Sequence, residues 1–169
     1  MITEKMVKVL SDQANAEFYS AYLYLAMSAC ADNAKFRGIA NWLYVQAREE
    51  QAHGTHIVKY LLERGAVPVF DSIKAPEASW GNMVELFEKV TAHEKYVTGL
   101  INKIADLALE EKDHATYNFI LWYVNEQIEE VAEAEEILAR VKLTGDHHGQ
   151  IYHLDSVLGA RKFKDPFSD

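Results

Sequence analysis

Residues that interrupt helices or cross-link chains are scarce in this sequence. Its 169 residues include only three prolines and eight glycines, a composition that suits long helices far better than strands joined by many turns. Cys30 is the only cysteine, which excludes an intrachain disulfide and leaves nothing in the thiol count that requires an oxidising compartment. We therefore expect an all-α fold.

The sequence also lacks any long hydrophobic run. The most apolar stretch, from Ala21 to Ala31, is about half the length needed to span a bilayer and contains Ser28. The opening residues, Met1 to Lys5, lack the apolar core of a secretory signal. A net charge of −9 argues against a nucleic-acid surface. We expect a cytoplasmic protein without nucleic-acid or membrane partners.

Helical periodicity divides most of the chain into four long segments. Short joints at 33–35 and around Lys112 are expected to make neighbouring helices antiparallel, as two hairpins. A shorter amphipathic segment follows at about 150–160. The four long helices are predicted over residues 3–32, 36–64, 81–110 and 113–142.

One long connection separates the two hairpins. It runs from Gly65 to Ser79, contains Pro68 and Pro76, and shows no sustained helical period, so we expect an extended crossover. At this length the chain is most simply one domain over residues 1–169. Its expected parts are a four-helix bundle (1–145), a short fifth helix (146–161) and a polar, loosely held tail (162–169).

Glu50 and His53 form the most informative motif. Residues three apart lie about 60° apart around a helix, so a carboxylate and an imidazole at this spacing can reach one metal ion from a single face. Glu17, Glu94 and Glu130 lie on otherwise apolar stripes of the other helices, where a lone buried charge is costly. The pattern predicts a di-metal site inside the bundle.

A less specific explanation exists for each glutamate taken alone, as one half of an ion pair or as a residue at a solvated edge. However, the stripes carry no Lys or Arg to neutralise the set, and four carboxylates balance two divalent cations. Oxygen-rich ligation with one imidazole suits iron or manganese better than zinc. Because such a shell favours Fe(III) over Fe(II), the pattern predicts oxidation of ferrous iron, with Gln127 as a further ligand candidate on the fourth helix.

Two further features have more than one interpretation. A third, weaker metal position could use Glu49, Glu126, Glu129 and Glu130, although a solvated acidic helix face is the ordinary explanation of such a run. Tyr24 lies one heptad after Glu17 and is either a core tyrosine with a hydrogen-bond partner or a redox donor to the metals. Tyr24 and Trp122 are the two candidate electron sources, with packing the simpler role for Trp122.

Together these residues resemble the bacterial non-haem ferritins. The resemblance covers the chain from Glu17 through Glu50-x-x-His53, Glu94 and the run 125–130 to the short last helix. It implies a ferritin-like four-helix bundle with a long crossover between helices two and three and a short fifth C-terminal helix. It also implies a homo-oligomeric cage of 24 subunits that stores ferric mineral, with dioxygen or hydrogen peroxide as the oxidant of Fe(II).

The same resemblance implies roles for individual residues. Glu17, Glu50 and His53 would hold one iron, with Glu50 as the bridge to the second. Glu94 and Glu130 would hold the second iron, with Gln127 beside it. A third iron would use Glu49, Glu126, Glu129 and Glu130, and Tyr24 would be the redox-capable tyrosine.

The sequence departs from related families at three positions. Bacterioferritin-like chains carry a second Glu-x-x-His motif and a haem-ligating Met, whereas this chain has Gln127, Glu130 and Gln51 at those places. A permanent di-iron cofactor and haem are therefore disfavoured, and iron is expected to bind more transiently at the second position. Two alternatives stay open: a non-storing di-iron oxidase or peroxidase that acts on a diffusible substrate, and a non-catalytic, metal-buffering bundle.

Overall fold

A computed structural model describes residues 1–77, 79–145 and 148–168. Within these residues every regular element is a helix, and the all-α expectation is confirmed. The four long helices begin and end within about two residues of their predicted positions. The short fifth helix begins and ends about two residues earlier than predicted. The helices are α1 (Glu4–Asn33), α2 (Arg37–Glu63), α3 (Met83–Glu110), α4 (His114–Thr144) and α5 (His148–Leu158).

Side chains just outside the helices fix where three of them begin. Thr3 accepts a hydrogen bond from the backbone N–H of Met6 at 3.1 Å, and the Asn82 and Asp113 side chains cap α3 and α4 in the same way. Each such bond satisfies one of the N–H groups that a helix start leaves free. The two hairpin turns contain Lys35 and Lys112 in the left-handed region, with φ of 73° and 56°.

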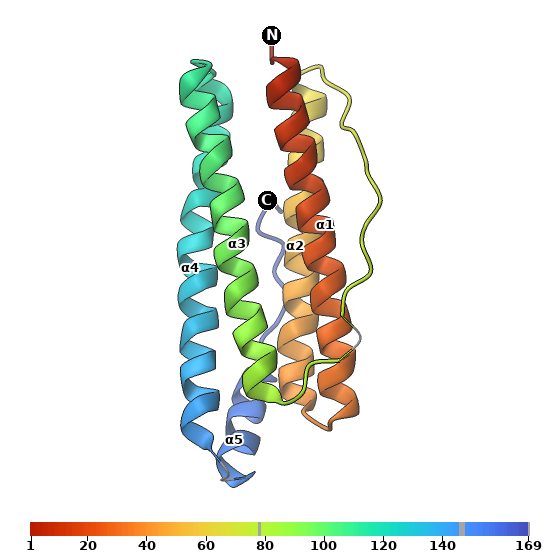
Figure 1. Cartoon of the computed structure of the whole chain (residues 1–169), viewed down its shortest axis with the longest axis vertical. Coiled ribbons are helices and arrows are strands. Elements are labelled where there is room, and N and C mark those ends of the chain that lie inside the picture. The colour runs from red at the N-terminus through yellow and green to blue at the C-terminus, as the bar shows by residue number, and fades with distance from the viewer. Residues whose placement is uncertain (78, 146–147, 169) are drawn as a thin grey trace.

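The four long helices form a bundle of two antiparallel hairpins (Figure 1). The crossover between α2 and α3 runs back along the length of the bundle beside α1, as the extended connection that the sequence predicts (Figure 1). Polar contacts attach it to α1: Asn15 donates to the carbonyl of Val69 at 3.0 Å, and the N–H of Val69 donates to Ser11 at 3.1 Å. Because of this crossover, the second hairpin begins at the opposite end of the bundle from the first.

Apolar side chains fill the bundle as two separate clusters. One contains Leu10 and Ile101, and the other contains Met27 and Phe87. On every long helix the change from one cluster to the other occurs at the glutamates and the glutamine that the sequence singles out. A polar layer therefore lies between two apolar halves. None of the described helices has both the length and the apolar character needed to cross a membrane.

Helix α5 packs against the start of α2. Asp155 accepts a hydrogen bond from the backbone N–H of Ile39 at 2.8 Å, and Leu154 and Leu158 are buried against the bundle. Gly38 permits this approach, because a Cβ atom there would lie only 1.6 Å from the carbonyl oxygen of Asp155. The short helix is thus held by a cap, two apolar anchors and a close backbone contact.

The tail after α5 is held against the bundle, so the expectation of a loose tail is wrong for residues 162–168. Asn41 donates to the carbonyl of Arg161 at 2.9 Å, and the Arg48 guanidinium lies 3.9 Å from the ring centre of Phe163. Phe167 stacks on His56 with ring centres 3.7 Å apart. Two aromatic anchors inside an otherwise polar segment explain why it packs, since each gains apolar contact by leaving water.

Candidate metal centre

The polar layer contains seven of the predicted site residues. α1 contributes Glu17 and Tyr24, α2 contributes Glu50 and His53, and α3 contributes Glu94. α4 contributes Gln127 and Glu130. All seven are buried, with exposed fractions between 0% for Tyr24 and 6% for Glu130. The helical periods therefore turn every one of these polar side chains inward.

Glu17, Glu50 and His53 lie at metal-binding distance of one another. One ligand atom from each falls within 4.8 Å of the other two, and His53 Nδ1 is 3.5 Å from Glu50 Oε2. Gln13 donates to Glu17 Oε1 at 2.8 Å, but Glu17 Oε2 is buried with no hydrogen-bond partner among the described residues. A buried carboxylate oxygen without a donor is costly unless a cation binds it.

Glu94 and Glu130 form the other half of the layer. The Tyr24 hydroxyl donates to Glu94 Oε1, and the Gln127 amide donates to Glu94 Oε2 at 3.3 Å. Gln46 joins the two halves, because its amide N–H groups lie 2.6 Å from Glu130 Oε2 and 3.3 Å from Glu50 Oε1. Neutral amide and hydroxyl donors thus orient the carboxylates and leave their charge uncompensated.

Burial shifts the titration of all four carboxyls in the same direction. It raises the pKa of Glu50 to about 8, and the negative charge of Glu94 adds to the effect. Burial, followed by neighbouring carboxylates, raises the pKa of Glu17 and of Glu130 well above the ordinary value. Burial raises the pKa of Glu94 as well, against the hydrogen bond from Tyr24. At neutral pH the metal-free layer therefore holds protons that a divalent cation would displace.

Most of the chain is similar to proteins of one known family. A family model described as a ferritin-like domain matches residues 7–144. The chain belongs to the ferritin family. It is 38% identical over 161 residues to a bacterial non-heme ferritin of Bacteroides fragilis, covering 95% of this chain and all of the relative. It is 40% identical over 159 residues to a probable bacterial non-heme ferritin-like protein of Haemophilus influenzae, with 94% and 96% covered.

Solved structures give the same assignment for the fold. An open pore ferritin from the archaeon Archaeoglobus fulgidus superposes with a TM-score of 0.95 at 40% identity, covering 96% of this chain and 100% of that one. A humanized archaeal ferritin superposes with a TM-score of 0.96 at 41% identity, covering 97% and 99%. The predicted ferritin-like bundle with a crossover and a short fifth helix is confirmed.

The residues of the expected third position are less well gathered in this ferritin-family chain. Glu49 is half-buried and pairs with Arg161, whose Nη2 lies 2.5 Å from its Oε2. Glu126 is half-buried and Glu129 is exposed. Among the described residues, the triad of Glu17, Glu50 and His53 is the group that brings three such ligand atoms to metal-binding distance.

Three aromatic rings surround His53. Trp122, Tyr123 and Phe167 lie edge-on to its ring with centres 5.4, 5.9 and 6.1 Å away. Tyr123 also donates to the backbone carbonyl of His53 at 2.9 Å. These contacts fix the plane of the imidazole, which supports the interpretation of Trp122 as a packing residue.

Three residues next to the site were not anticipated from the sequence. Gln13 and Gln46 each lie four positions before the glutamate they contact, and that spacing could have identified them, since such pairs face each other on a helix. Arg161 offered no local signal, because it follows α5 and reaches the site from more than a hundred positions away. The apolar stripes carry no Lys or Arg, as the sequence shows, but the guanidinium of Arg161 comes close to the site from outside them.

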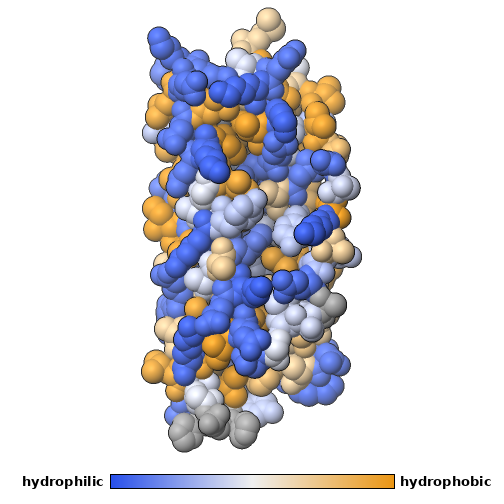
Figure 2. Space-filling model, viewed as in Figure 1, coloured by the Kyte–Doolittle hydropathy of each residue, from blue (hydrophilic) through white to orange (hydrophobic). Residues whose placement is uncertain are grey.

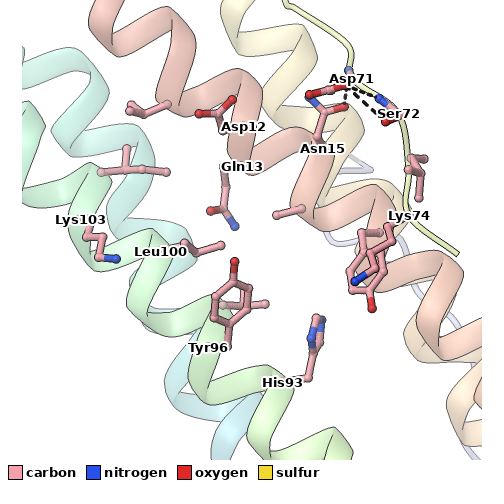
Figure 3. A pocket seen from close by; sticks show the side chains of 16 residues that line it. Asp12, Gln13, Asn15, Asp71, Ser72, Lys74, His93, Tyr96, Leu100 and Lys103 are labelled. Carbon is pink, nitrogen blue, oxygen red and sulfur yellow. Dashed lines mark hydrogen bonds between the residues drawn. The ribbon is translucent and has the colours of Figure 1, made fainter. Parts of the chain in front are cut away.

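A groove of about 500 Å³ reaches toward the same layer from the side of α1, α3 and the crossover. Figure 3 shows the Gln13 amide and the His93 ring directed into it. Gln13 contacts Glu17, and His93 packs edge-on against Tyr24 with ring centres 5.9 Å apart. Burial lowers the pKa of His93 to about 4, so this histidine is neutral at physiological pH.

Proposed function

We propose that this chain is an iron-storage ferritin with ferroxidase activity. Glu17, Glu50 and His53 would hold one Fe(II), and Glu94 and Glu130 would hold a second. Glu50 would bridge the two ions, since it belongs to the triad and is linked through Gln46 to Glu130. The observation that carries the proposal is the buried triad, whose ligand atoms lie within 4.8 Å of one another around an unpartnered oxygen of Glu17.

The chemistry follows from the donor set. Two Fe(II) ions release two electrons, which reduce dioxygen to hydrogen peroxide or hydrogen peroxide to water. The carboxylates stabilise the more highly charged Fe(III) product. Their raised pKa values mean that they lose protons when iron binds, and these protons are available to the reduced oxygen. We propose Tyr24, whose hydroxyl donates a hydrogen bond to Glu94, as the redox-capable residue beside the two ions.

The second iron position, at Glu94 and Glu130, should bind iron transiently rather than permanently. Gln127 offers a neutral amide where a carboxylate would bind more strongly, and that amide already bonds to Glu94 and to Thr98. Glu130 takes the place of a second imidazole. We therefore propose that oxidised iron leaves this position for a stored mineral, that no haem is bound, and that Glu49, Glu126, Glu129 and Glu130 receive iron only weakly.

Storage requires a closed assembly, and the surface of the chain supports one. Large apolar side chains are exposed on α1, α2 and the crossover, including Tyr22, Leu25, Tyr44, Val69 and Phe70. Figure 2 shows apolar residues interrupting the charged surface along the edge that carries the crossover. Such patches mark contact surfaces. We propose that copies of this chain, each a single domain, associate there in a cytoplasmic cage of 24 subunits.

The test is anaerobic loading of the metal-free protein with Fe(II), followed by air. Oxygen uptake, iron retained per subunit and particle mass are recorded together. Rapid uptake with many more than three irons retained in a large particle is expected. His53→Ala should slow oxidation at least about tenfold, whereas His56→Ala, one turn along the same helix, serves as the matched control. Equal rates in the two variants would refute the site.

One observation favours a second candidate, a di-iron oxidase or peroxidase that stores no metal. The groove beside α1 and α3 has a largely apolar lining and ends at Gln13 and His93, next to Glu17 and Tyr24 (Figure 3). A diffusible organic substrate could approach the metals there. This candidate predicts that the loading experiment stops at two oxidised irons per subunit in a small oligomer.

A further inference from the structure

Arg161 is a basic side chain that lies beside the polar layer and contacts Glu49 and Glu133. It follows α5, and its side chain is only 20% exposed. Its Nη2 lies 2.5 Å from Glu49 Oε2 and 3.7 Å from Glu133 Oε2. Its Nη1 donates to the side-chain oxygen of Gln46 at 2.7 Å. One guanidinium therefore joins an expected third-site ligand to the amide that orients the inner pair.

One residue, Gln46, connects Arg161 to the inner carboxylates. The Gln46 amide accepts from Arg161 through its oxygen and donates through its nitrogen to Glu130 at 2.6 Å and Glu50 at 3.3 Å. A fully buried amide cannot reverse without losing these bonds, since its donors and acceptor are not interchangeable. Arg161 thus fixes the orientation in which Gln46 presents N–H groups to both carboxylates.

The guanidinium is also preorganised. Asn41 holds the Arg161 backbone carbonyl at 2.9 Å, and the guanidinium carbon lies 4.8 Å from the ring centre of Trp42. The anchors at Phe163 and Phe167 hold the chain that follows. Since most of its conformational freedom is already lost, Arg161 binds Glu49 more strongly than an exposed arginine would.

Its charge reaches most of the expected third position. Burial raises the pKa values of Glu49, Glu126 and Glu130, and the positive charge of Arg161 opposes that effect at all three. A divalent ion placed among these carboxylates would do the same. Arg161 and a third metal ion therefore compete for the same negative charge.

We infer that Arg161 is a built-in competitor of a third cation: it takes Glu49 as its own partner, and a metal binds there only when the guanidinium moves away. The inference rests on the proposed function, because it concerns the position next to the inner pair. Its consequence is control of occupancy. Two cations fill the inner layer first, and a third binds only at higher concentration, by displacing Arg161 from Glu49.

The test counts Mn²⁺ bound to the metal-free protein by the loss of its free-ion electron paramagnetic resonance signal, without any turnover. Mn²⁺ prefers the same oxygen ligands and is not oxidised under these conditions. The wild type should bind two ions tightly and a third weakly. Arg161→Gln should tighten the third binding step by at least about tenfold, the order expected when a charge-assisted hydrogen bond no longer competes. It should weaken rather than tighten the first two steps, because Gln46 loses the donor that fixes its orientation.

Three control variants separate this effect from simpler ones. Arg140→Gln removes the same charge from an ion pair with Glu136 on α4, 2.5 Å long, and should leave the third step unchanged. Arg161→Lys keeps the charge and should keep the third step weak. Phe167→Ala loosens the tail while retaining Arg161, and it too should leave the third step weak. Particle mass and helical circular dichroism check that each variant is folded.

The outcomes distinguish the inference from the function on which it rests. If the wild type binds no Mn²⁺ tightly, the proposed di-metal site fails. If two ions bind tightly and Arg161→Gln leaves the third step unchanged, the role of Arg161 is refuted and the di-metal site stands. If Arg140→Gln or Phe167→Ala tightens the third step equally, net charge or a loosened tail is responsible and the inference is wrong. Tightening in Arg161→Gln alone supports it.

Discussion

Replacing Glu50 with Gln tests whether the buried carboxyls destabilise the metal-free bundle. Burial raises the pKa of Glu50 from 4.5 to about 8. At about 1.4 kcal/mol per pH unit, ionising that carboxyl in the folded protein costs on the order of 3 to 5 kcal/mol above pH 8. Gln has nearly the same shape, and Gln46, 3.3 Å away, can donate to its amide oxygen. The metal-free variant should therefore be more stable at high pH.

The sign of the pH dependence follows from the direction of the shift. Because the folded-state pKa of Glu50 lies above the unfolded-state value, the folded protein binds more protons than the unfolded chain between pH 4.5 and about 8. The contribution of Glu50 to the stability of the metal-free wild type therefore falls as pH rises through this window and levels off above it. The variant lacks this contribution but keeps those of Glu17, Glu94 and Glu130, whose pKa values are also raised.

The assay is thermal unfolding with a chelator, at one protein concentration, at pH 6 and pH 8.5. For a chain of this size 1 kcal/mol corresponds to roughly 2 to 4 °C, so Glu50→Gln should gain several degrees at pH 8.5 and less at pH 6. Glu63→Gln, on the same helix in an exposed pair with Lys59, is the control and should shift little. Wild-type stability that rises between the two pH values, or identical pH profiles for wild type and Glu50→Gln, would refute the reasoning.

Two further predictions concern single contacts. Tyr24→Phe removes the hydroxyl that donates to Glu94, and its loss raises the pKa of that carboxyl further. The second Mn²⁺ should therefore bind about tenfold more weakly at neutral pH. An unchanged Mn²⁺ titration would show that this hydrogen bond does not contribute to metal binding. Gly38→Ala places a Cβ 1.6 Å from the carbonyl oxygen of Asp155 and should detach α5, seen as new protease cleavage within 148–158. Gly99→Ala, where a Cβ meets nothing within 4 Å, should instead stabilise the protein by up to about 1 kcal/mol; equal protease resistance of the two variants would contradict this.

The helices and the inner carboxylates were predictable because both depend on local periodicity. Glu17, Glu50 and Glu94 each interrupt an apolar stripe of period 3.6, and the structure places all three in one buried layer. Long helices leave little freedom in where their side chains point, so register along the sequence determines register in the bundle. The turns at Lys35 and Lys112 were equally predictable, since such short connections force the helices they join to run antiparallel.

The contacts around that layer were predictable only in part. The spacing of four residues pairs Gln13 with Glu17 and Gln46 with Glu50, but the contact of Gln46 with Glu130 on another helix depends on the tertiary structure. Arg161 and Phe167 belong to a polar tail whose path depends on where α5 docks. No periodicity in the sequence relates residue 161 to residue 49, so their pairing is a property of the tertiary structure alone.

The crossover makes the second hairpin a repeat of the first. Since it returns the chain to the end of the bundle where α1 stops (Figure 1), α3 runs opposite to α1 and α4 runs opposite to α2, as a twofold repeat of the first hairpin requires. The same sequence interval separates Glu17 from Glu50 and Glu94 from Gln127, and His53 and Glu130 follow at equal steps.

Among the six proposed inner ligands, two of the three corresponding pairs differ: Glu50 corresponds to Gln127, and His53 corresponds to Glu130. The two proposed iron positions therefore share one frame and differ in affinity. Two differences between otherwise equivalent positions are thus enough to make iron fill one of the two proposed sites before the other.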